Sequence, residues 1–475
     1  MFKKIYSLLL FVSALGYAAF FSLSAYAQPE SYKFNDKQIS LTNTLIDRGL
    51  EGNQAYEILE SLTTQIGPRL AGSASEERAR EWGVKKLKSL GFKNVRIEPF
   101  EIPYWERVVE EAKITAPFAQ KLSVTALGNS VATPKDGITA QIVRFETLSD
   151  LIEAPLTGFE DKIIFVDEVM TRTQDGSGYG WAVAKRSGAA NEAGKRGALA
   201  AIIRSVGTDR DRRNPHTGNM RYQEDVKKVP IAALSNPDAD QLTRAIRIAK
   251  EQNAGPLTLY LRVEVMTTKS VQSGNVIGEI PGQSDEVIVV GGHLDSWDLG
   301  TGAIDDGAGV AITMAAAKLV GDLRGKPKRT IRVILWGAEE VGLLGARAYA
   351  KAHADEMEKH VLAAESDFGA RTIWQLQTRF GEASLGKATT MARYLRRIGV
   401  GPGHNEARGG PDVGPLRELG VPVVTLYQNG SDYFDFHHTK DDTLDKVVPS
   451  ELSQNVAAYA AMIYMASEMS GDFRE

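Results

Sequence analysis

From about residue 272 onward, the chain alternates between short apolar runs and longer segments whose apolar residues recur every three or four positions. The apolar runs, among them VIVV, RVILW, VLAA and VVTLY, are continuous, which is typical of strands buried on both faces. The intervening segments, such as GAGVAITMAAAKLV, have helical periodicity. This alternation predicts an α/β fold with a mostly parallel, doubly wound sheet that helices cover on both faces.

Metal-binding residue types follow these predicted strands. His293 and Asp295 come after VIVV, Glu339 and Glu340 after RVILW, and Asp367 after VLAAE. A fourth strand, VVTLY, leads through a loop to DYFDFHHTKDDTLD. Ligands of such sheets gather at the carboxyl ends of the strands, so we expect these side chains to meet at one rim.

Each residue also has a simpler interpretation. Asp305 or Asp306 could cap the helix that begins at GAGVAIT, and the adjacent glutamates could sit at a solvated helix start. His437 could be an ordinary surface residue. The combination argues for a shared site, because independent caps and surface residues need not fall on one rim.

A hydrolytic two-metal site needs two divalent ions about 3.5–4 Å apart, a bridging carboxylate and a further carboxylate that acts as base. The chain supplies each part: Asp295 can orient the ring of His293, and Glu339 and Glu340 can act as base and ligand. The residues alone leave open whether Asp305 or Asp306 bridges and whether His437 or His438 binds. No G-x-S-x-G motif supports a serine nucleophile instead.

The first residues predict export. MFKK is followed by a long apolar stretch that ends in Ala25-Tyr26-Ala27, which is typical of a signal peptide over residues 1–27, cleaved after Ala27. The alternative is an uncleaved membrane anchor, since the stretch is long enough to span a bilayer. The chain has no cysteine, which excludes disulfides and thiolate ligands. We expect a periplasmic or extracellular protein.

The charge and the distribution of apolar residues exclude two kinds of partner, nucleic acids and membranes. The net charge is −4, and no run of Lys and Arg suggests nucleic-acid binding. No second long apolar run is present, so we expect no membrane contact after signal cleavage.

Changes in pattern along the chain predict three parts. Residues 28–116 form the N-terminal part of one domain, with a polar lead-in to residue 50, helices over 53–90 and a strand that ends at Pro103. Short strands and helices over residues 117–268 read as an inserted α/β domain. Residues 269–475 complete the first domain and carry the metal site.

Five motifs carry a family resemblance. GGHLDS, GAIDDGAG, WGAEEVGLLGA, ESDFG and FHHTKDDTLD resemble, in order, those of the aminopeptidase Y-type di-zinc exopeptidases. IGPRLAGSASEERAREW and NVRIEPFEIPYWER are similar to the carboxypeptidase Q branch, also called plasma glutamate carboxypeptidase. The insertion resembles a protease-associated domain.

The resemblance implies a role for each matching residue. Asp305 matches the bridging ligand, Glu339 the general base and Asp295 the orienting residue. Two zinc ions are implied, one held by His293 and Asp367 and the other by Glu340 and His438; cobalt or manganese would also suit these ligands. The branch also implies a homodimer.

The expected function is hydrolysis of dipeptides or short peptides by an exported exopeptidase of aminopeptidase or dipeptidase type. The alternatives are carboxypeptidase specificity, a non-catalytic binding protein, and another zinc chemistry such as deacylation or glutamine cyclisation. Candidate substrate contacts are His404, Asp412 and Tyr433, and a carboxylate could pair with Arg371 or Arg379. The segment PHTG at residues 215–218 is a candidate to reach the cleft.

Overall fold

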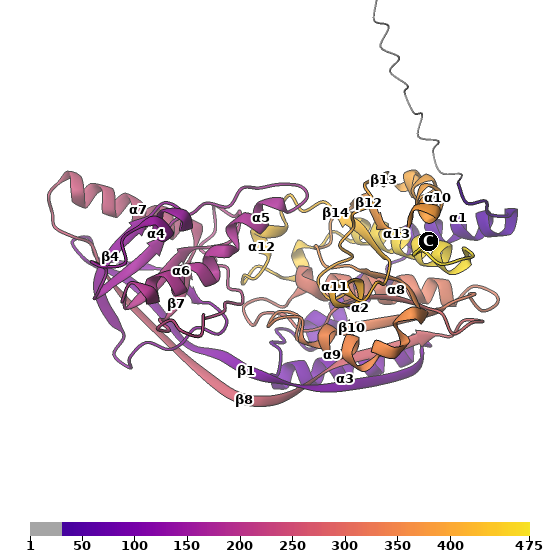
Figure 1. The fold of residues 1–475 in the computed structure, drawn as a ribbon, viewed down its shortest axis with the longest axis horizontal. Helices are drawn as coiled ribbons and strands as arrows, with labels where there is room; N and C mark the ends of the chain where they lie inside the picture. The colour runs from indigo at the N-terminus through magenta and orange to yellow at the C-terminus, as the bar shows by residue number, and fades with distance from the viewer. Residues whose placement is uncertain (1–30) are drawn as a thin grey trace, which may run out of the picture.

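The computed structural model describes residues 31–475, so the predicted signal peptide lies outside the described residues. One sheet of fourteen strands runs through two lobes, which Figure 1 shows side by side. The strands in order along the sheet are β13-β12-β14-β11-β9-β10-β8-β4-β5-β6-β7-β3; off this path, β1 pairs with β8, and β2 pairs with β1. We call residues 117–257 the smaller lobe, and residues 31–92 and 281–475 the larger lobe.

The larger lobe confirms the predicted α/β class. Its central strands β9 (Val287–His293), β10 (Thr330–Trp336), β11 (His360–Glu365) and β14 (Val423–Gln428) are parallel. Towards the edge, β12 (Ile373–Arg379) is antiparallel to β14, and the two-residue strand β13 (Gly401–Pro402) pairs with β12.

Alternate residues of β9 pack into different apolar cores, so both faces of the sheet are covered as predicted. Ile288 and Val290 face one core, and Val287 and Val289 face the other. The first core is covered by α1 (Asp36–Glu51), α2 (Gln54–Gln65), α3 (Ala74–Ser89), α8 (Ala308–Gly321), α10 (Leu385–Leu395) and α13 (Pro449–Glu468). The second is covered by α9 (Leu344–Ala352) and α11 (Gly414–Glu418).

The polar lead-in expected up to residue 50 was wrong, because α1 occupies most of it. Asn35 begins the helix with a capping box: its side chain accepts a hydrogen bond from the backbone of Gln38, whose side chain accepts one from Asn35. Leu45 and Ile46 are fully buried where α1 packs against α13. A narrow apolar stripe within a polar sequence is enough to dock a helix on a large core.

Two long antiparallel strands, β1 (Lys93–Ala116) and β8 (Thr258–Ile280), run through both lobes (Figure 1). The predicted strand end at Pro103 was wrong, because β1 continues beyond it. The pairing with β8 shifts register between Ile102 and Tyr104, so Pro103 lies at an irregularity, where the missing N–H of proline is tolerated.

The smaller lobe has its own layer of strands. β4 (Ile138–Phe145), β5 (Lys162–Val166), β6 (Ala200–Arg204) and β7 (Ile231–Leu234) are parallel, and β4 is antiparallel to β8. The short strands are β2 (Gln120–Leu122) and β3 (Val124–Ala126), and the helices are α4 (Leu148–Glu153), α5 (Ser177–Ala182), α6 (Ala184–Lys195) and α7 (Asn236–Glu251). The predicted boundary at residue 268 falls inside β8; the assignment as a protease-associated domain stays a prediction.

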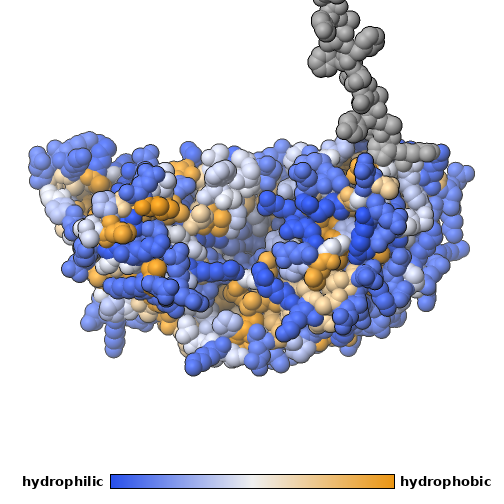
Figure 2. All heavy atoms as spheres, in the orientation of Figure 1, coloured by the Kyte–Doolittle hydropathy of each residue, from blue (hydrophilic) through white to orange (hydrophobic). Residues whose placement is uncertain are grey.

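Between the lobes lies the short helix α12 (Tyr433–Phe436), beside α5 (Figure 1). Over residues 31–475, no helix combines the length and apolar character that a membrane span requires. The face drawn in Figure 2 is mostly hydrophilic, with hydrophobic residues in separate patches.

Candidate functional site

Four segments of the larger lobe end at one edge of the sheet. His293 is the last residue of β9, Glu339 and Glu340 follow β10, and Asp367 follows β11. His438 comes two residues after α12. Because β9, β10 and β11 are parallel, their carboxyl ends meet at this edge, and they bring these side chains together as expected.

The carboxylate of Asp305 lies between two histidines. Its Oδ1 is 3.0 Å from Nε2 of His293, and its Oδ2 is 3.1 Å from Nε2 of His438. A second carboxylate stands beside each nitrogen: Asp367 Oδ1 is 3.7 Å from His293, and Glu340 Oε2 is 3.0 Å from His438. All five side chains are more than nine-tenths buried. We call these five residues the central cluster.

Asp306, the alternative to Asp305, has both carboxylate oxygens engaged by the backbone. Its Oδ2 accepts a hydrogen bond from the N–H of His293 at 2.9 Å, and its Oδ1 accepts one from Gly309 at 3.1 Å. Asp306 thus ties the end of β9 to the first turn of α8. The geometry favours Asp305 over Asp306 as a residue whose two oxygens could contact cations.

Asp295 holds the turn that carries the two glutamates. Its carboxylate accepts hydrogen bonds from the N–H of Glu339 at 3.0 Å and of Glu340 at 3.3 Å. Nδ1 of His293 is 2.9 Å from the backbone carbonyl of Asp295 but 3.9 Å from its carboxylate. Asp295 therefore orients the His293 ring chiefly through its main chain, whereas its side chain positions the glutamates.

The two adjacent histidines both face Asp305. The rings of His437 and His438 stack with centroids 3.5 Å apart, and Nε2 of His437 is 3.5 Å from Asp305 Oδ2. His438 alone also contacts Glu340. Nδ1 of His438 is 3.2 Å from the carbonyl of Thr217. If Nδ1–H donates to that carbonyl, the lone pair on Nε2 faces the carboxylates, which is the tautomer that a metal ligand needs.

Burial and crowding perturb the titration of this site. Burial holds the pKa of Glu339 and of Asp367 well above the usual range. Although burial favours its neutral form, Asp305 has a pKa well below the usual range because His293 and His438 contact it. Burial also opposes charge on His438, yet the neighbouring carboxylates raise its pKa to about 9. So many buried acids require compensating positive charge, from protons or from cations.

The donor atoms fit divalent metal ions. Two buried carboxylate oxygens of the central cluster, Glu340 Oε1 and Asp367 Oδ1, have no hydrogen-bond partner among residues 31–475. Histidine nitrogen and carboxylate oxygen are ligands that suit zinc and similar ions. Three overlapping groups bring their ligand atoms within 4.8 Å of one another: Asp305, His437 and His438; His293, Asp305 and Glu340; and His293, Asp306 and Asp367.

A cavity of about 690 Å³ opens over the central cluster. Asp305, Glu339 and His438 line it, and so does Tyr433, one of the predicted substrate contacts. Residues of both lobes form its walls, including Tyr179 from α5. Its size suits a short peptide or another small ligand.

The other predicted substrate contacts lie elsewhere. Asp412 is fully buried and donates its N–H to Glu365 at 2.7 Å, and the exposed His404 does not line the cavity. Arg371 forms ion pairs with two carboxylates, and Arg379 donates to a backbone carbonyl. Neither arginine lines the cavity.

The smaller lobe reaches the central cluster through residues 215–218, the segment suggested by the sequence. Thr217 donates its N–H to the carbonyl of His438 at 3.0 Å. Arg186 of α6 has Nη2 3.3 Å from Nδ1 of the same histidine. The sequence offered no signal for the Arg186 contact, because 252 positions separate the two residues.

Two buried charged residues that sequence reasoning missed hold the loop with Asp305. Arg69 donates to the carbonyls of Thr301 and Gly302 at 2.6 and 2.8 Å. Asp442 accepts a hydrogen bond from the N–H of Asp305 at 3.2 Å. A charged residue inside an apolar motif such as IGPRLAG is a signal for such a role, because an arginine is rarely buried without partners.

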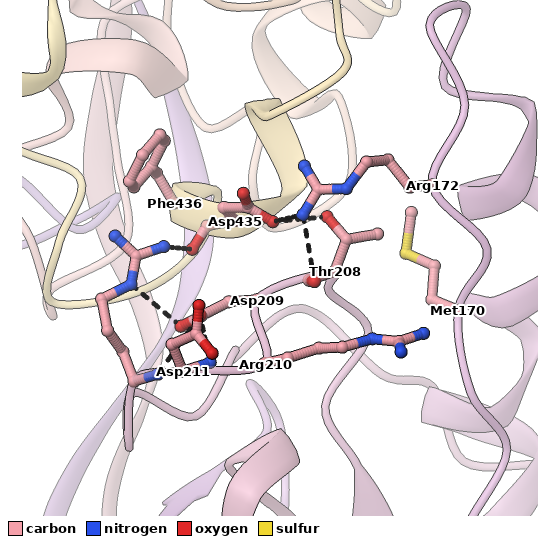
Figure 3. A pocket seen from close by; sticks show the side chains of 9 residues that line it. Met170, Arg172, Thr208, Asp209, Arg210, Asp211, Asp435 and Phe436 are labelled. Carbon is pink, nitrogen blue, oxygen red and sulfur yellow. Dashed lines mark hydrogen bonds and ion pairs between the residues drawn. The ribbon is translucent and has the colours of Figure 1, made fainter.

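A second pocket, of about 660 Å³, also borders α12 (Figure 3). Its charges are largely paired with one another: Arg172 lies 2.6 Å from Asp435, which also accepts a hydrogen bond from Thr208 at 2.7 Å. Arg210 extends along the pocket without an ion pair among the described residues. These contacts connect the smaller lobe to α12, so we interpret this pocket as a junction between lobes.

Comparison with known proteins agrees with this geometry. The model of peptidase family M28 matches residues 275–463. Carboxypeptidase Q of Bos taurus is 34% identical over 438 residues, which cover 92% of this chain and 90% of that protein. The chain belongs to peptidase family M28. This confirms the family predicted from the motifs, and an M28 peptidase is an enzyme that hydrolyses peptide bonds.

Solved structures of other peptidases share the fold. The crystal structure of a peptidase M28 precursor from Shewanella amazonensis SB2B is 47% identical, with a TM-score of 0.89, and the match covers 93% of this chain and 99% of that one. A zinc aminopeptidase from Bacillus subtilis, 20% identical, has a TM-score of 0.64, with 89% of this chain and 97% of that one covered. The second likeness concerns the fold alone.

Proposed function

We propose that this M28 peptidase is a two-zinc exopeptidase that cleaves dipeptides or other short peptides. The observation that carries the proposal is the position of Asp305, whose two oxygens face His293 and His438. Each histidine has a further carboxylate beside it, so the central cluster divides into two half-sites that share one residue. A shared carboxylate is the feature that a two-metal hydrolase needs.

In this proposal, His293 and Asp367 would hold one ion, Glu340 and His438 would hold the other, and Asp305 would be a ligand common to both. The ligand types favour zinc, and cobalt or manganese would also bind. Divalent ions bound here would lower the pKa of a bound water and polarise the substrate carbonyl.

Glu339 acts as the general base. Asp295 fixes its backbone, and Glu339 lines the cavity beside the central cluster. Glu339 takes the proton from the attacking water and returns it to the leaving amine. A carboxylate in this role needs a pKa closer to neutrality than that of a free glutamate, and burial shifts the pKa of Glu339 in that direction.

Substrate specificity and location also belong to the proposal. The names of the relatives include carboxypeptidase Q and a zinc aminopeptidase, so aminopeptidase, dipeptidase and carboxypeptidase activities are all candidates. The complete set of ligand types and the base argue against a non-catalytic binding protein. The proposed signal peptide would export the enzyme to the periplasm or the medium, and the homodimer is carried over from the carboxypeptidase Q branch.

Replacing the base tests the activity. We expect Glu339→Gln to lower kcat on a dipeptide about 10²- to 10⁴-fold while zinc content stays at the wild-type value, because the amide cannot accept the proton. Glu358→Gln, an exposed glutamate, is the matched control and should change neither quantity. Treatment of the wild-type with a chelator should abolish hydrolysis, and added zinc should restore it. Full activity of Glu339→Gln would refute the assignment.

A further inference from the structure

Away from the carboxyl edge of the sheet, the cavity walls carry more positive than negative side chains. Five arginines line the cavity, and none has a carboxylate within 4.0 Å over residues 31–475: Arg186, Arg221, Arg347, Arg408 and Arg417. The acids that line it belong to the carboxyl edge of the sheet, apart from Asp175 and Glu418. If two divalent ions neutralise the three carboxylates of the central cluster, the whole cavity becomes attractive to anions.

Arg186 is the buried member of this set. Its exposed fraction is 4%, its Nη1 donates to the hydroxyl of Tyr179 at 2.8 Å, and its Nε has no hydrogen-bond partner among the described residues. The guanidinium packs directly on Gly218, where a Cβ atom would lie 2.2 Å from Cζ. A buried cation without a carboxylate partner is unfavourable, and a carboxylate from a ligand would remove that cost.

Its distance from the central cluster limits what Arg186 can bind. Nη2 of Arg186 is 3.3 Å from Nδ1 of His438, whereas the central cluster faces Nε2 of the same histidine. The guanidinium therefore lies about the width of one imidazole ring further from the cluster than Nε2. One residue of extended chain spans about 3.3–3.6 Å. A peptide whose scissile carbonyl lies at the central cluster therefore needs about one further residue to reach Arg186 with its C-terminus.

We propose that Arg186 binds the C-terminal carboxylate of the substrate, so that the enzyme releases a single C-terminal residue and requires a free C-terminus. The inference rests on the proposed peptidase activity. The smaller lobe thereby supplies the specificity of a reaction carried out by the larger lobe. Guanidinium groups bind carboxylates through two parallel hydrogen bonds, which a lysine cannot reproduce.

The test compares Ala-Ala, N-acetyl-Ala-Ala, Ala-Ala-amide and Ala-Glu-amide as substrates of the zinc-loaded enzyme. We expect the wild-type to cleave Ala-Ala at least tenfold more efficiently than either amide. Arg186→Met should lower kcat/KM on Ala-Ala about 10- to 100-fold, the usual effect of losing a charged hydrogen bond, and leave Ala-Ala-amide within about twofold. The kcat/KM of Arg186→Lys on Ala-Ala should lie between those of the wild-type and Arg186→Met. The acetylated substrate shows whether a free N-terminus is needed as well.

Arg210→Met is the matched control. It removes the same charge from the smaller lobe, but Arg210 lies at the second pocket and does not line the cavity (Figure 3). We expect Arg210→Met to cleave all four substrates at wild-type rates. An equal loss on Ala-Ala and Ala-Ala-amide in Arg186→Met would overturn the proposal, because Arg186 would then act by supporting His438. Selective loss on Ala-Glu-amide would overturn it too, since the side-chain carboxylate would be the one bound.

A binding measurement separates this inference from the proposed activity. By calorimetry, zinc-loaded wild-type protein should bind alanine at least tenfold more tightly than alaninamide, and Arg186→Lys should reduce that preference. Equal binding of alanine and alaninamide would overturn the role of Arg186 even if peptides are cleaved. A clear preference for alanine in a protein that cleaves no peptide would refute the proposed function alone.

Discussion

Among single residues, the neighbouring histidines His437 and His438 are the hardest to tell apart. Their rings stack, and both have Nε2 within 3.5 Å of Asp305. Their surroundings differ, because only His438 also contacts Glu340 and has its second nitrogen directed at a backbone carbonyl. Burial and the charge of His438 hold the pKa of His437 well below the usual range, so His437 is a neutral ring stacked on that of His438.

Alanine variants of this pair test that distinction. We expect His438→Ala to lose at least one equivalent of bound zinc and at least about 10²-fold in activity, because a ligand is removed. His437→Ala should keep its zinc and lose less than about tenfold. Zinc content after gel filtration and initial rates are the measurements. The reverse pattern would make His437 the ligand.

At the scale of helices, the docking of α1 on α13 depends on one close approach. A Cβ atom on Gly49 would lie 2.5 Å from Cα of Ala457, which is closer than real contacts allow. Because Gly49 has no side chain, the backbone of α1 packs directly against α13 at this point. This contact fixes the N-terminal end of the described chain to the last helix of the larger lobe.

A larger residue at this contact should destabilise the larger lobe. We expect Gly49→Ala to lower the free energy of unfolding by about 1–3 kcal/mol, because overpacking outweighs the gain in helix propensity of roughly 1 kcal/mol. Gly180→Ala, on an exposed helix position with no atom near the added methyl, should be neutral or slightly stabilising. Thermal unfolding midpoints of both variants would show this. Equal effects would mean that the helices separate easily.

Across the whole molecule, the candidate site is built by both lobes. The larger lobe supplies the central cluster, whereas Thr217 and Arg186 of the smaller lobe contact Nδ1 of His438, the ring nitrogen that does not face Asp305. The strands β1 and β8 run unbroken between the lobes. Their continuity, together with the ion pairs at α12, limits how far the lobes can separate over the cavity.

Metal removal should therefore make global stability depend on pH in a specific direction. In the metal-free protein, Glu339 and Asp367 have raised pKa values and the pKa of His438 is about 9, so the folded state holds protons that the unfolded state has lost. Stability then falls as pH rises from about 6 to 9. Zinc displaces these protons, so its stabilising effect should be larger at pH 9 than at pH 6.

Unfolding midpoints of chelator-treated and zinc-loaded protein at the two pH values provide the measurement. At each pH, the midpoints of the metal-free and the zinc-loaded form of the same protein are compared. Titratable groups far from the site contribute equally to the stability of both forms. A zinc-induced increase that is the same at pH 6 and pH 9 would contradict this account of the titration.

Features that depend on neighbouring residues were predicted better than features that depend on residues far apart in the sequence. The strands that end at His293 and before Glu339 were predicted because continuous apolar runs are local features. The helix α1 was missed although its capping box is also local, since only four of its sixteen residues are buried. The continuation of β1 past Pro103 was missed because it depends on pairing with β8, whose partner residues lie 142 to 164 positions further along the chain.

The sequence by itself determined the α/β class, the alternation of strands and helices from residue 287 onward, and the set of acids and histidines at the strand ends. Periodicity and strand-end position need no knowledge of the chain path. Only the tertiary structure decided that Asp305 faces both histidines while Asp306 binds the backbone, and that Asp295 holds the glutamates with its side chain. It also brought Arg186 against His438. Such contacts depend on how the whole chain packs, so no local pattern of residues encodes them.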